Sequence, residues 1–299
     1  MERLAPICLF TYNRLEETKQ TIVTLQKNFL AKDSELFVFS DGPKNKASSY
    51  KIEAVRDYLK NIEGFKSVTI YESDVNKGLA KSIIEGVSKV LANSDKVIVM
   101  EDDLVSTPNF LDFMNQTLNF YKVDTAVFSI SGYTLNLPSL KHEKKDFYFG
   151  YRASSWGWGI WRDRWSPIDW EAKDYTTFVK NKKKVNDFKR GGTDMPRMLK
   201  NQMNGKIDSW AIRFCYHQFK ENLMTVFPTI SKIKSIGFSE EATHTSGTKR
   251  FITPIDSEIK RNFSFHTFTE IDKKLIKEFS SFFSVKNRII NQLRQKIKF

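Results

Sequence analysis

Short apolar runs alternate with amphipathic stretches along residues 1–131. The apolar runs are rich in Val, Ile and Phe, as buried strands are, and the stretches between them repeat apolar residues at helical spacing. The pattern predicts strands at 6–11, 35–40, 67–72, 96–101 and 125–130, and helices near 15–30, 48–62, 78–93 and 108–121. Because each crossover must return to the same edge, this order favours a parallel sheet covered on both faces, and therefore an α/β fold.

An acidic triplet ends the fourth predicted strand. In VIVMEDDLVSTPNFL, residues 97–111, four apolar residues lead directly into Glu101, Asp102 and Asp103. Carboxylates about 4–6 Å apart repel one another by about 3–4 kcal/mol at an effective dielectric near 20. Thr107 is expected to cap a helix that begins at Pro108, which places the triplet in the preceding loop. A positive partner is therefore expected beside these carboxylates.

Polar residues follow two other predicted strands at the same edge, where ligands of open α/β sheets bind. Thr11-Tyr12-Asn13-Arg14 follows the first strand, and Asp41-Gly42 follows the second. Neither a dinucleotide-binding glycine motif nor a P-loop explains this edge. A hard cation such as Mg²⁺ or Mn²⁺ binds one or two carboxylates together with water and phosphate oxygens, and it would neutralise the triplet. The alternative is solvated surface charge.

The composition limits the partners and the compartment. The chain has 299 residues and 48 Lys plus Arg against 35 Asp plus Glu, so its net charge of +13 favours an anionic partner such as a nucleotide, a polyphosphate or an anionic bilayer. Cys8 and Cys215 indicate neither a disulfide framework nor a zinc site, which fits a reducing compartment. The first residues contain too short an apolar run for a signal peptide. We expect a cytoplasmic protein.

Four motifs together resemble the nucleotide-diphospho-sugar transferases of the GT-A fold. They are FTYNR, SDG, NKGLAKSIIEGV (76–87) and EDDLVSTPNFL. The resemblance covers about residues 4–247 and is to bacterial family 2-like enzymes and to the Golgi N-acetylglucosaminyltransferase that starts complex N-glycans. It implies a Rossmann-like, mostly parallel sheet with helices on both faces.

The resemblance also implies roles for individual residues. Asp103 would bind the metal, Asp102 the ribose or sugar, and Glu101 a hydroxyl of the donor sugar. Asp41 would contact the base, Lys81 would approach the diphosphate, and Thr11, Tyr12, Asn13 and Arg14 would line the nucleotide. Asp41-Gly42 stands where many family 2 enzymes have two acidic residues.

A tryptophan-rich segment, SSWGWGIWRDRW, spans residues 154–165. One interpretation is an aromatic core, because Trp buries a large area. The other is a sugar site in which Gly157 allows a close backbone approach and an indole stacks on the sugar. In the resembling enzymes a Gly-Trp segment borders the donor sugar and the acceptor. Both interpretations hold if Trp161 and Trp165 lie in the core and Trp156 or Trp158 lies at the pocket.

An inverting transferase needs one carboxylate near the acceptor hydroxyl to take its proton. The resemblance assigns this role to Asp208, at the start of a predicted helix in 207–219, with Asp194 in GGTDMPRM as the alternative. A purely structural role for Asp208, as a helix N-cap, stays open.

One histidine is a candidate metal ligand. His244 lies in the polar loop 237–250 after the predicted strand 223–230, where GT-A enzymes often place a late His, and neutral imidazole is an acceptable Mn²⁺ ligand. A loop histidine without function is the alternative. We interpret His142, His217 and His266 as structural.

The last residues, 272–299, combine an apolar stripe at helical spacing with eight Lys or Arg against two acids, a net charge of +6. This helix could dock on the core or lie at an anionic inner leaflet, and the interleaved aromatics and cations favour the membrane. We therefore divide the chain into a catalytic domain at 1–250, with a nucleotide-binding half at 1–131 and an acceptor half at 132–250, and a C-terminal extension at 251–299.

The sequence thus predicts a metal-dependent, inverting glycosyltransferase that moves a sugar from a nucleotide-diphospho-sugar, a UDP-sugar, to a hydroxyl of a glycan or lipid-linked acceptor in cell-surface polysaccharide assembly. We expect it in the cytoplasm, peripheral to the inner face of the plasma membrane. Two alternatives remain. A sugar-phosphate nucleotidyltransferase would need a Gly-rich phosphate loop, which TYNRLEE lacks. A nucleic-acid-binding protein would need a recognisable reading module, and we expect no nucleic acid partner.

Overall fold

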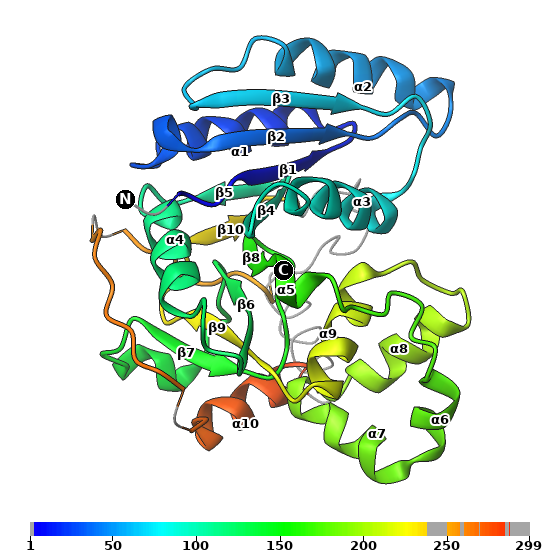
Figure 1. Ribbon diagram of the computed structural model, residues 1–299, viewed down its shortest axis with the longest axis vertical. Helices are drawn as coiled ribbons and strands as arrows, with labels where there is room; N and C mark the ends of the chain where they lie inside the picture. Colours follow the sequence, from blue (N-terminus) through cyan, green and yellow to red (C-terminus); the bar gives the residue numbers. More distant parts are fainter. Residues whose placement is uncertain (1–2, 238–249, 258–259, 269, 285–286, 288–299) are drawn as a thin grey trace, which may run out of the picture.

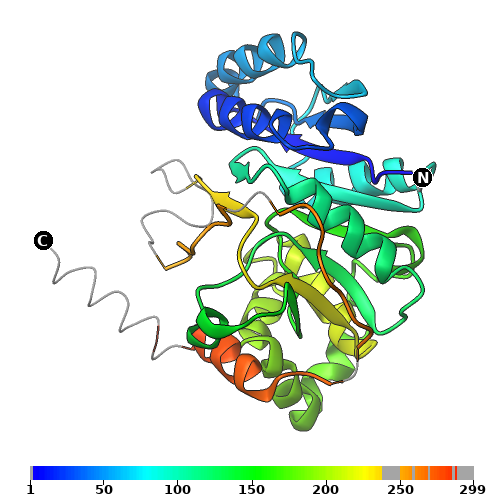
Figure 2. The ribbon, with the colours of Figure 1, turned by 90° about the vertical axis from the view of Figure 1, so that its left-hand side faces the viewer.

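The computed structural model describes residues 3–237, 250–257, 260–268, 270–284 and 287 (Figures 1 and 2). Its centre is an eight-stranded sheet in the order β3-β2-β1-β4-β8-β6-β9-β7. The strands are β1 (Ile7–Thr11), β2 (Glu35–Ser40), β3 (Ser67–Glu72), β4 (Lys96–Glu101), β6 (Val127–Ser131), β7 (Phe147–Gly150), β8 (Trp158–Trp161) and β9 (Met224–Pro228). A small antiparallel ladder joins β5 (Leu104–Ser106) to β10 (Ile233–Ser235).

The predicted α/β fold is confirmed. Strands β1 to β4 pair in parallel, as the alternating pattern predicted, and β6 pairs in parallel with β9. β8 runs antiparallel between β4 and β6, and β7 runs antiparallel to β9. The sheet is therefore mixed in its second half, where the sequence predicted only the strands that became β6 and β9.

Helices cover both faces of the sheet (Figure 1). They are α1 (Leu15–Gln26), α2 (Lys46–Leu59), α3 (Leu79–Leu91), α4 (Phe110–Phe120), α5 (Arg162–Trp165), α6 (Tyr175–Lys180), α7 (Lys182–Phe188), α8 (Met195–Met203), α9 (Trp210–Lys220) and α10 (Lys273–Phe282), with 3-10 turns η1 (Ala31–Asp33), η2 (Pro138–His142) and η3 (Lys189–Gly191). Successive β1 side chains enter opposite cores. Leu9 packs in the cluster of α1, α2 and α4, and Phe10 packs in the cluster of α3 and α9. Each residue of β1 is buried, as expected for a strand covered on both sides.

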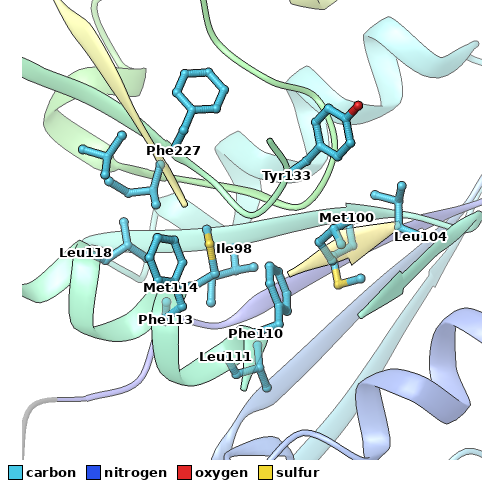
Figure 3. Close-up of a cluster of buried hydrophobic side chains, with 14 of the residues drawn as sticks. Ile98, Met100, Leu104, Phe110, Leu111, Phe113, Met114, Leu118, Tyr133 and Phe227 are labelled. Carbon is cyan, nitrogen blue, oxygen red and sulfur yellow. The ribbon is translucent and has the colours of Figure 1, made fainter. Parts of the chain in front are cut away.

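Helix α4 is held by an apolar cluster that continues into the sheet (Figure 3). Phe110, Phe113 and Met114 are fully buried there with Ile98 of β4. The expected cap at Thr107 is wrong, because α4 begins at Phe110 and the Thr107 hydroxyl donates to Asn109 Oδ1 at 2.8 Å. The short strand β5 separates the acidic triplet from this helix, so the triplet lies at a β4–β5 turn.

The described part of the C-terminal extension packs on the same core as the rest of the chain. Leu275, Phe279 and Phe283 of the α10 region are buried, and the Ser139 hydroxyl donates to Glu278 at 2.6 Å. Upstream of α10, Asp256 forms a buried ion pair with Lys232. Helix α10 therefore docks on the core, which was one of the two alternatives. The preferred prediction, that its apolar face lies in a bilayer, is wrong for this helix. Residues 288–299 lie outside the described part of the chain.

None of the helices among the described residues is long and apolar enough to cross a membrane.

Replacing Phe279 by Ala tests the docking of α10. Its ring is buried against Phe227 and Phe283, with centroids 5.4 and 5.6 Å away. Losing this side chain should lower the free energy of unfolding by about 3 kcal/mol, because a cavity remains. Lys277→Ala on the exposed face of α10 is the matched control, and its effect should stay within about 0.5 kcal/mol. Urea denaturation measures both, and equal stabilities of the two variants would contradict a docked helix.

Candidate active site

Arg14 is the positive partner of the acidic triplet. It follows β1, and its guanidinium lies between two carboxylates at the end of β4. One nitrogen donates to Asp103 Oδ2 at 3.1 Å, and the other forms an ion pair with Asp102 Oδ1. The Arg14 side chain is 18% exposed, and those of Asp102 and Asp103 are 5% and 15% exposed. The structure therefore brings together three residues that were predicted from distant motifs.

Backbone and threonine contacts fix the same turn. The Tyr12 N–H donates to Asp102 Oδ2 at 3.3 Å. The Thr21 hydroxyl of α1 donates to the Asp102 carbonyl at 2.8 Å and accepts from the Leu104 N–H at 3.1 Å. Helix α1 thus braces the turn between β4 and β5, and the acidic side chains have little freedom to move apart.

One guanidinium does not balance three carboxylates. Burial, together with Asp103 and Asp102, raises the pKa of Glu101 to about 8, and Arg14 opposes this shift. Burial also raises the pKa of Asp102 to about 6, although the ion pair and hydrogen bond with Arg14 lower it in part. Without a bound ligand, the positive charge of Arg14 is therefore too small to neutralise the carboxyl groups of this site.

The chain that leaves β10 covers Asp103. A Cβ atom on Gly237 would lie 1.8 Å from Asp103 Oδ2, so any larger residue here would have to displace the Asp103 carboxylate. The Ile236 N–H donates to the Asp103 carbonyl at 2.8 Å. His244, the second predicted metal ligand, lies outside the described residues, seven positions after Gly237. Its role stays a prediction.

Asp41 anchors a loop beside the site. Its carboxylate accepts hydrogen bonds from the N–H groups of Gly42, Lys77 and Gly78 and from the Asn76 amide, at 2.9 to 3.1 Å. The loop 76–78 is thereby fixed at the end of β2, directly before α3. The predicted contact of Asp41 with a base stays a prediction, and the structure adds this anchoring role.

Asp208 faces that loop. Its Oδ2 lies 4.0 Å from the position a Cβ would take on Gly78, whose φ is +76°. Ser209, not Asp208, caps α9, because the Ser209 hydroxyl accepts from the Ile212 N–H at 3.4 Å. The Asp208 side chain is 65% exposed, and Arg213 donates to it at 3.2 Å. The purely structural interpretation as an N-cap is therefore wrong, and the carboxylate is accessible to a ligand.

Arg213 was missed by the sequence reasoning. It also donates to the Ser209 carbonyl at 3.2 Å and to the Trp170 carbonyl at 3.1 Å, so its guanidinium is fixed before it reaches Asp208. Its position five residues after Asp208, on the helix that the pattern predicted, is the signal that could have identified it.

The tryptophan-rich segment positions Asp208 indirectly. Trp158 is fully buried and stacks on Trp210, the first residue of α9, with centroids 4.9 Å apart. The Trp165 indole N–H donates to the Ser88 hydroxyl of α3 at 2.9 Å. The predicted position of Trp158 at the pocket is therefore corrected to the core, since a buried indole has no face for a sugar. The core placement of Trp161 and Trp165 is confirmed, as they are 2% and 4% exposed.

Trp156 and Gly157 have different surroundings. Trp156 is half-buried against Tyr133, with centroids 4.5 Å apart. Gly157 has φ +58°, and a Cβ there would lie 2.7 Å from Ile233 Cγ1 of β10. This glycine therefore serves packing, and sugar contacts at Trp156 or Gly157 stay predictions.

Asp194 belongs to a different ion pair. Arg152 donates to its Oδ1 at 2.8 Å, and the Arg152 guanidinium lies 3.9 Å above the Phe283 ring. Asp194 is thus engaged beside the α10 region, and its carboxylate is 12% exposed. These surroundings favour Asp208 over Asp194 as the accessible carboxylate.

The remaining predicted residues lie at the same sheet edge with fewer contacts. Thr11 is buried at the end of β1, and Asn13 is half-buried in the loop that follows. Lys81 is exposed on α3, and its ammonium lies 3.7 Å from Glu85. Their contacts with a nucleotide stay predictions.

The protein residues at this edge could provide only part of the coordination of a divalent cation. The described residues contain no group of three or more His, Cys, Asp or Glu side chains that could hold a metal ion. Asp103 offers one carboxylate, in a site where negative charge exceeds the single charge of Arg14. Mg²⁺ and Mn²⁺ sites built around one or two carboxylates are completed by water and substrate phosphates. The donor set therefore suits a cation that arrives with a nucleotide diphosphate.

Comparison with known proteins identifies a family. Residues 7–195 match the family model described as glycosyl transferase family 2. No curated protein matches the chain.

Two solved structures show weaker likeness. One is the mannosyltransferase PcManGT from Pyrobaculum calidifontis in complex with GDP-Man and Mn²⁺, with 12% identity and a TM-score of 0.41 over 73% of this chain and 69% of that chain. The other is S. aureus TarS, with 13% identity and a TM-score of 0.35 over 56% of this chain and 30% of that chain.

Replacing Arg14 by Gln tests whether its charge holds the edge together. The change leaves two largely buried carboxylates without their partner, and it should lower the free energy of unfolding by about 3 kcal/mol in EDTA at neutral pH. Arg3→Gln breaks an exposed pair with Glu35 and is the matched control, with an expected loss below about 1 kcal/mol. Adding Asp103→Asn to Arg14→Gln should restore part of the stability, because it removes one unpaired charge. A stable Arg14→Gln protein would refute this account.

Proposed function

Because the chain belongs to glycosyl transferase family 2, we propose that it transfers a sugar from a nucleotide-diphospho-sugar to a hydroxyl group of a glycan, with a divalent cation at Asp103 and with Asp208 as the base. The family match covers residues 7–195, more than half of the 299-residue chain, and the protein is a glycosyltransferase. The metal dependence, the stereochemical course and the substrates are our proposals.

One observation carries the mechanism. The exposed carboxylate of Asp208 faces Gly78 of the loop that Asp41 anchors, at the sheet edge that also bears Arg14 and the acidic triplet. A transferase needs a donor-binding surface and a nearby base that the acceptor can reach. Here both come from loops at the carboxyl ends of β1, β2 and β4, together with the start of α9.

Asp208 is suited to accept a proton. Its side chain does not cap α9, and Arg213 holds one oxygen at 3.2 Å while the residue stays 65% exposed. In the proposed reaction this carboxylate takes the proton of the acceptor hydroxyl as the oxygen attacks the anomeric carbon. Attack on the face opposite the departing diphosphate inverts the configuration. The bond to the acceptor oxygen forms as the bond to the diphosphate oxygen breaks.

The donor is proposed to lie along the loops after β1, β2 and β4. Thr11 to Arg14 would line the nucleotide, Lys81 would approach the diphosphate, and Asp102 and Glu101 would contact the ribose and the donor sugar. Asp103 would hold a divalent cation, which would supply positive charge at the leaving diphosphate. We propose a UDP-sugar as donor, and His244 as a further ligand from the segment that begins beside Asp103.

The acceptor is proposed to be a glycan or a lipid-linked glycan of the cell surface. The net charge of +13 supports an anionic partner. Because the apolar face of α10 is buried against the core, we propose that any contact with an anionic membrane uses other residues.

Replacing Asp103 by Ala tests the metal proposal. The variant should lose Mn²⁺-dependent binding of UDP and at least about 10²-fold in transfer, because the cation no longer stabilises the leaving group. Its fold should persist, since Arg14 keeps its ion pair with Asp102. Calorimetric titration of UDP with Mn²⁺ or EDTA measures the binding, and Asp57→Ala, an exposed carboxylate on α2, is the control. Undiminished transfer by Asp103→Ala in EDTA would disprove a metal at this site.

Replacing Asp208 by Asn tests the base. The amide cannot accept the proton, so kcat should fall by about 10²-fold or more while the affinity for the donor stays the same. Asp194→Asn is the comparison, because it changes a carboxylate that is engaged with Arg152. Single-turnover kinetics with saturating donor separate binding from transfer. If Asp194→Asn loses catalysis and Asp208→Asn retains it, the two roles are exchanged.

A further inference from the structure

A surface pocket lies at the opposite end of α9 from Asp208. It has a volume of about 560 Å³ and is lined by Asn186, Asp187, Lys189, Arg190, Phe219 and Asn222. These residues come from α7, η3, the end of α9 and the turn that follows it, in the lower part of the view in Figure 1. The pocket is open to solvent, since Asn186, Asp187, Lys189 and Asn222 are exposed. Because α9 rises by about 1.5 Å per residue, its two ends are about 16 Å apart.

Arg190 is the unusual residue of this pocket. Its guanidinium carbon lies 4.2 Å from the centre of the Tyr151 ring and 5.2 Å from that of Phe219. Its Nε is buried without a hydrogen-bond partner, and within the described part of the chain no carboxylate pairs with the group. By contrast, Arg14, Arg152 and Arg213 each have a carboxylate within 3.2 Å.

The local backbone is built to hold Arg190 in this place. A Cβ on the following residue, Gly191, would lie 2.6 Å from the Tyr151 carbonyl oxygen, so the glycine lets η3 approach Tyr151 closely. Stacking on an aromatic face offsets part of the cost of burying a cation but satisfies none of its N–H groups. Burial lowers the pKa of Arg190, which Tyr151 and Asp187 raise in part. An anionic ligand group would supply the acceptor that Nε lacks.

The rest of the lining fits hydroxyl groups better than a bare anion. Asn186, Asn222 and Asp187 combine amide donors with carbonyl and carboxylate acceptors, and a sugar hydroxyl both donates and accepts. The half-buried Phe219 offers an apolar surface to the C–H groups of a ring. The Asp187 carboxylate can accept a hydrogen bond from a hydroxyl, and every sugar supplies several hydroxyls.

We propose that this pocket binds a negatively charged sugar unit of the acceptor, with its acid group on Arg190 and its hydroxyls on Asn186, Asp187 and Asn222. The idea that this sugar belongs to the acceptor rests on the proposed glycosyl transfer. The idea that the pocket binds an acidic sugar does not depend on that proposal. The pocket is a site separate from the one around Asp208, and it would hold an acceptor chain at a distance from the reacting hydroxyl.

Binding of small probes, without donor or metal, tests the proposal. The probes are glucuronate, glucose 6-phosphate, neutral glucose and inorganic phosphate, titrated while the Arg190 Nε–H resonance is followed by NMR. An acidic sugar should shift this resonance with an affinity at least about tenfold higher than that of glucose or inorganic phosphate. If glucuronate binds more tightly than glucose 6-phosphate, the acid group is a carboxylate; the reverse order indicates a phosphate. Equal effects of all four probes, or a preference for inorganic phosphate, would indicate adventitious binding and overturn the proposal.

Three variants assign the binding to this pocket. Arg190→Gln should weaken the acidic sugar at least about tenfold, measured by calorimetry, whereas Lys183→Gln, the same loss of charge on α7 outside the pocket, should change it less than about twofold. Arg190→Lys keeps the charge and should bind more tightly than Arg190→Gln, so equal affinities of these two variants would refute a charge-based contact. Asp103→Ala should bind the acidic sugar like the unaltered protein, whether or not the proposed metal-dependent transfer is correct. Loss of binding in Asp103→Ala would place the probe at the transfer site and refute a second site.

Discussion

Arg14 lies between the carboxylates of Asp102 and Asp103, and it joins the loop after β1 to the turn after β4. These two strands are neighbours in the centre of the sheet, so the ion pairs fix the position of the edge at which the other loops meet. Without the guanidinium, like charges would force the turn open or shift its protonation. With it, the edge is ordered yet still carries excess negative charge. This combination suits a site that receives a cation together with its ligand.

Aromatic packing holds the second half of the chain, and with it the start of α9, at that edge. Trp158 of β8 stacks on Trp210, and Trp165 bonds to Ser88 of α3, so the start of α9 is held against the helix that follows the loop 76–78. Arg213 then orients Asp208 toward Gly78. The tryptophans thus act on the site through the backbone they support. A change in the core at Trp158 would therefore alter the distance between the carboxylate and the loop.

The sequence predicted the first four strands and their helices because buried parallel strands and amphipathic crossovers leave strong periodic signals. It did not predict β5, which has three residues, or the antiparallel β8, because an apolar run reports burial and not the identity of the neighbouring strand. The acidic triplet, Arg14 and Asp208 could be identified from motifs. The ion pairs of Arg14 with Asp102 and Asp103 could not, because they are tertiary contacts between distant segments. For α10, an apolar stripe beside lysines is compatible with a bilayer and with a protein groove, and only packing of Leu275 and Phe279 decides between them.

The two ends of α9 place a geometric condition on the acceptor. Asp208 lies before the first turn, and the Arg190 pocket lies beside the last, about 16 Å away by the rise of the helix. A single sugar cannot reach both, whereas an oligosaccharide can bind the pocket while one of its hydroxyls lies at Asp208. In the proposed arrangement, binding energy gained at the distant pocket would order the acceptor before reaction and need not weaken the contacts at the reacting centre. In a basic protein, an acidic chain would also be attracted to the surface before it docks. An acceptor that is both extended and negatively charged satisfies these two conditions together.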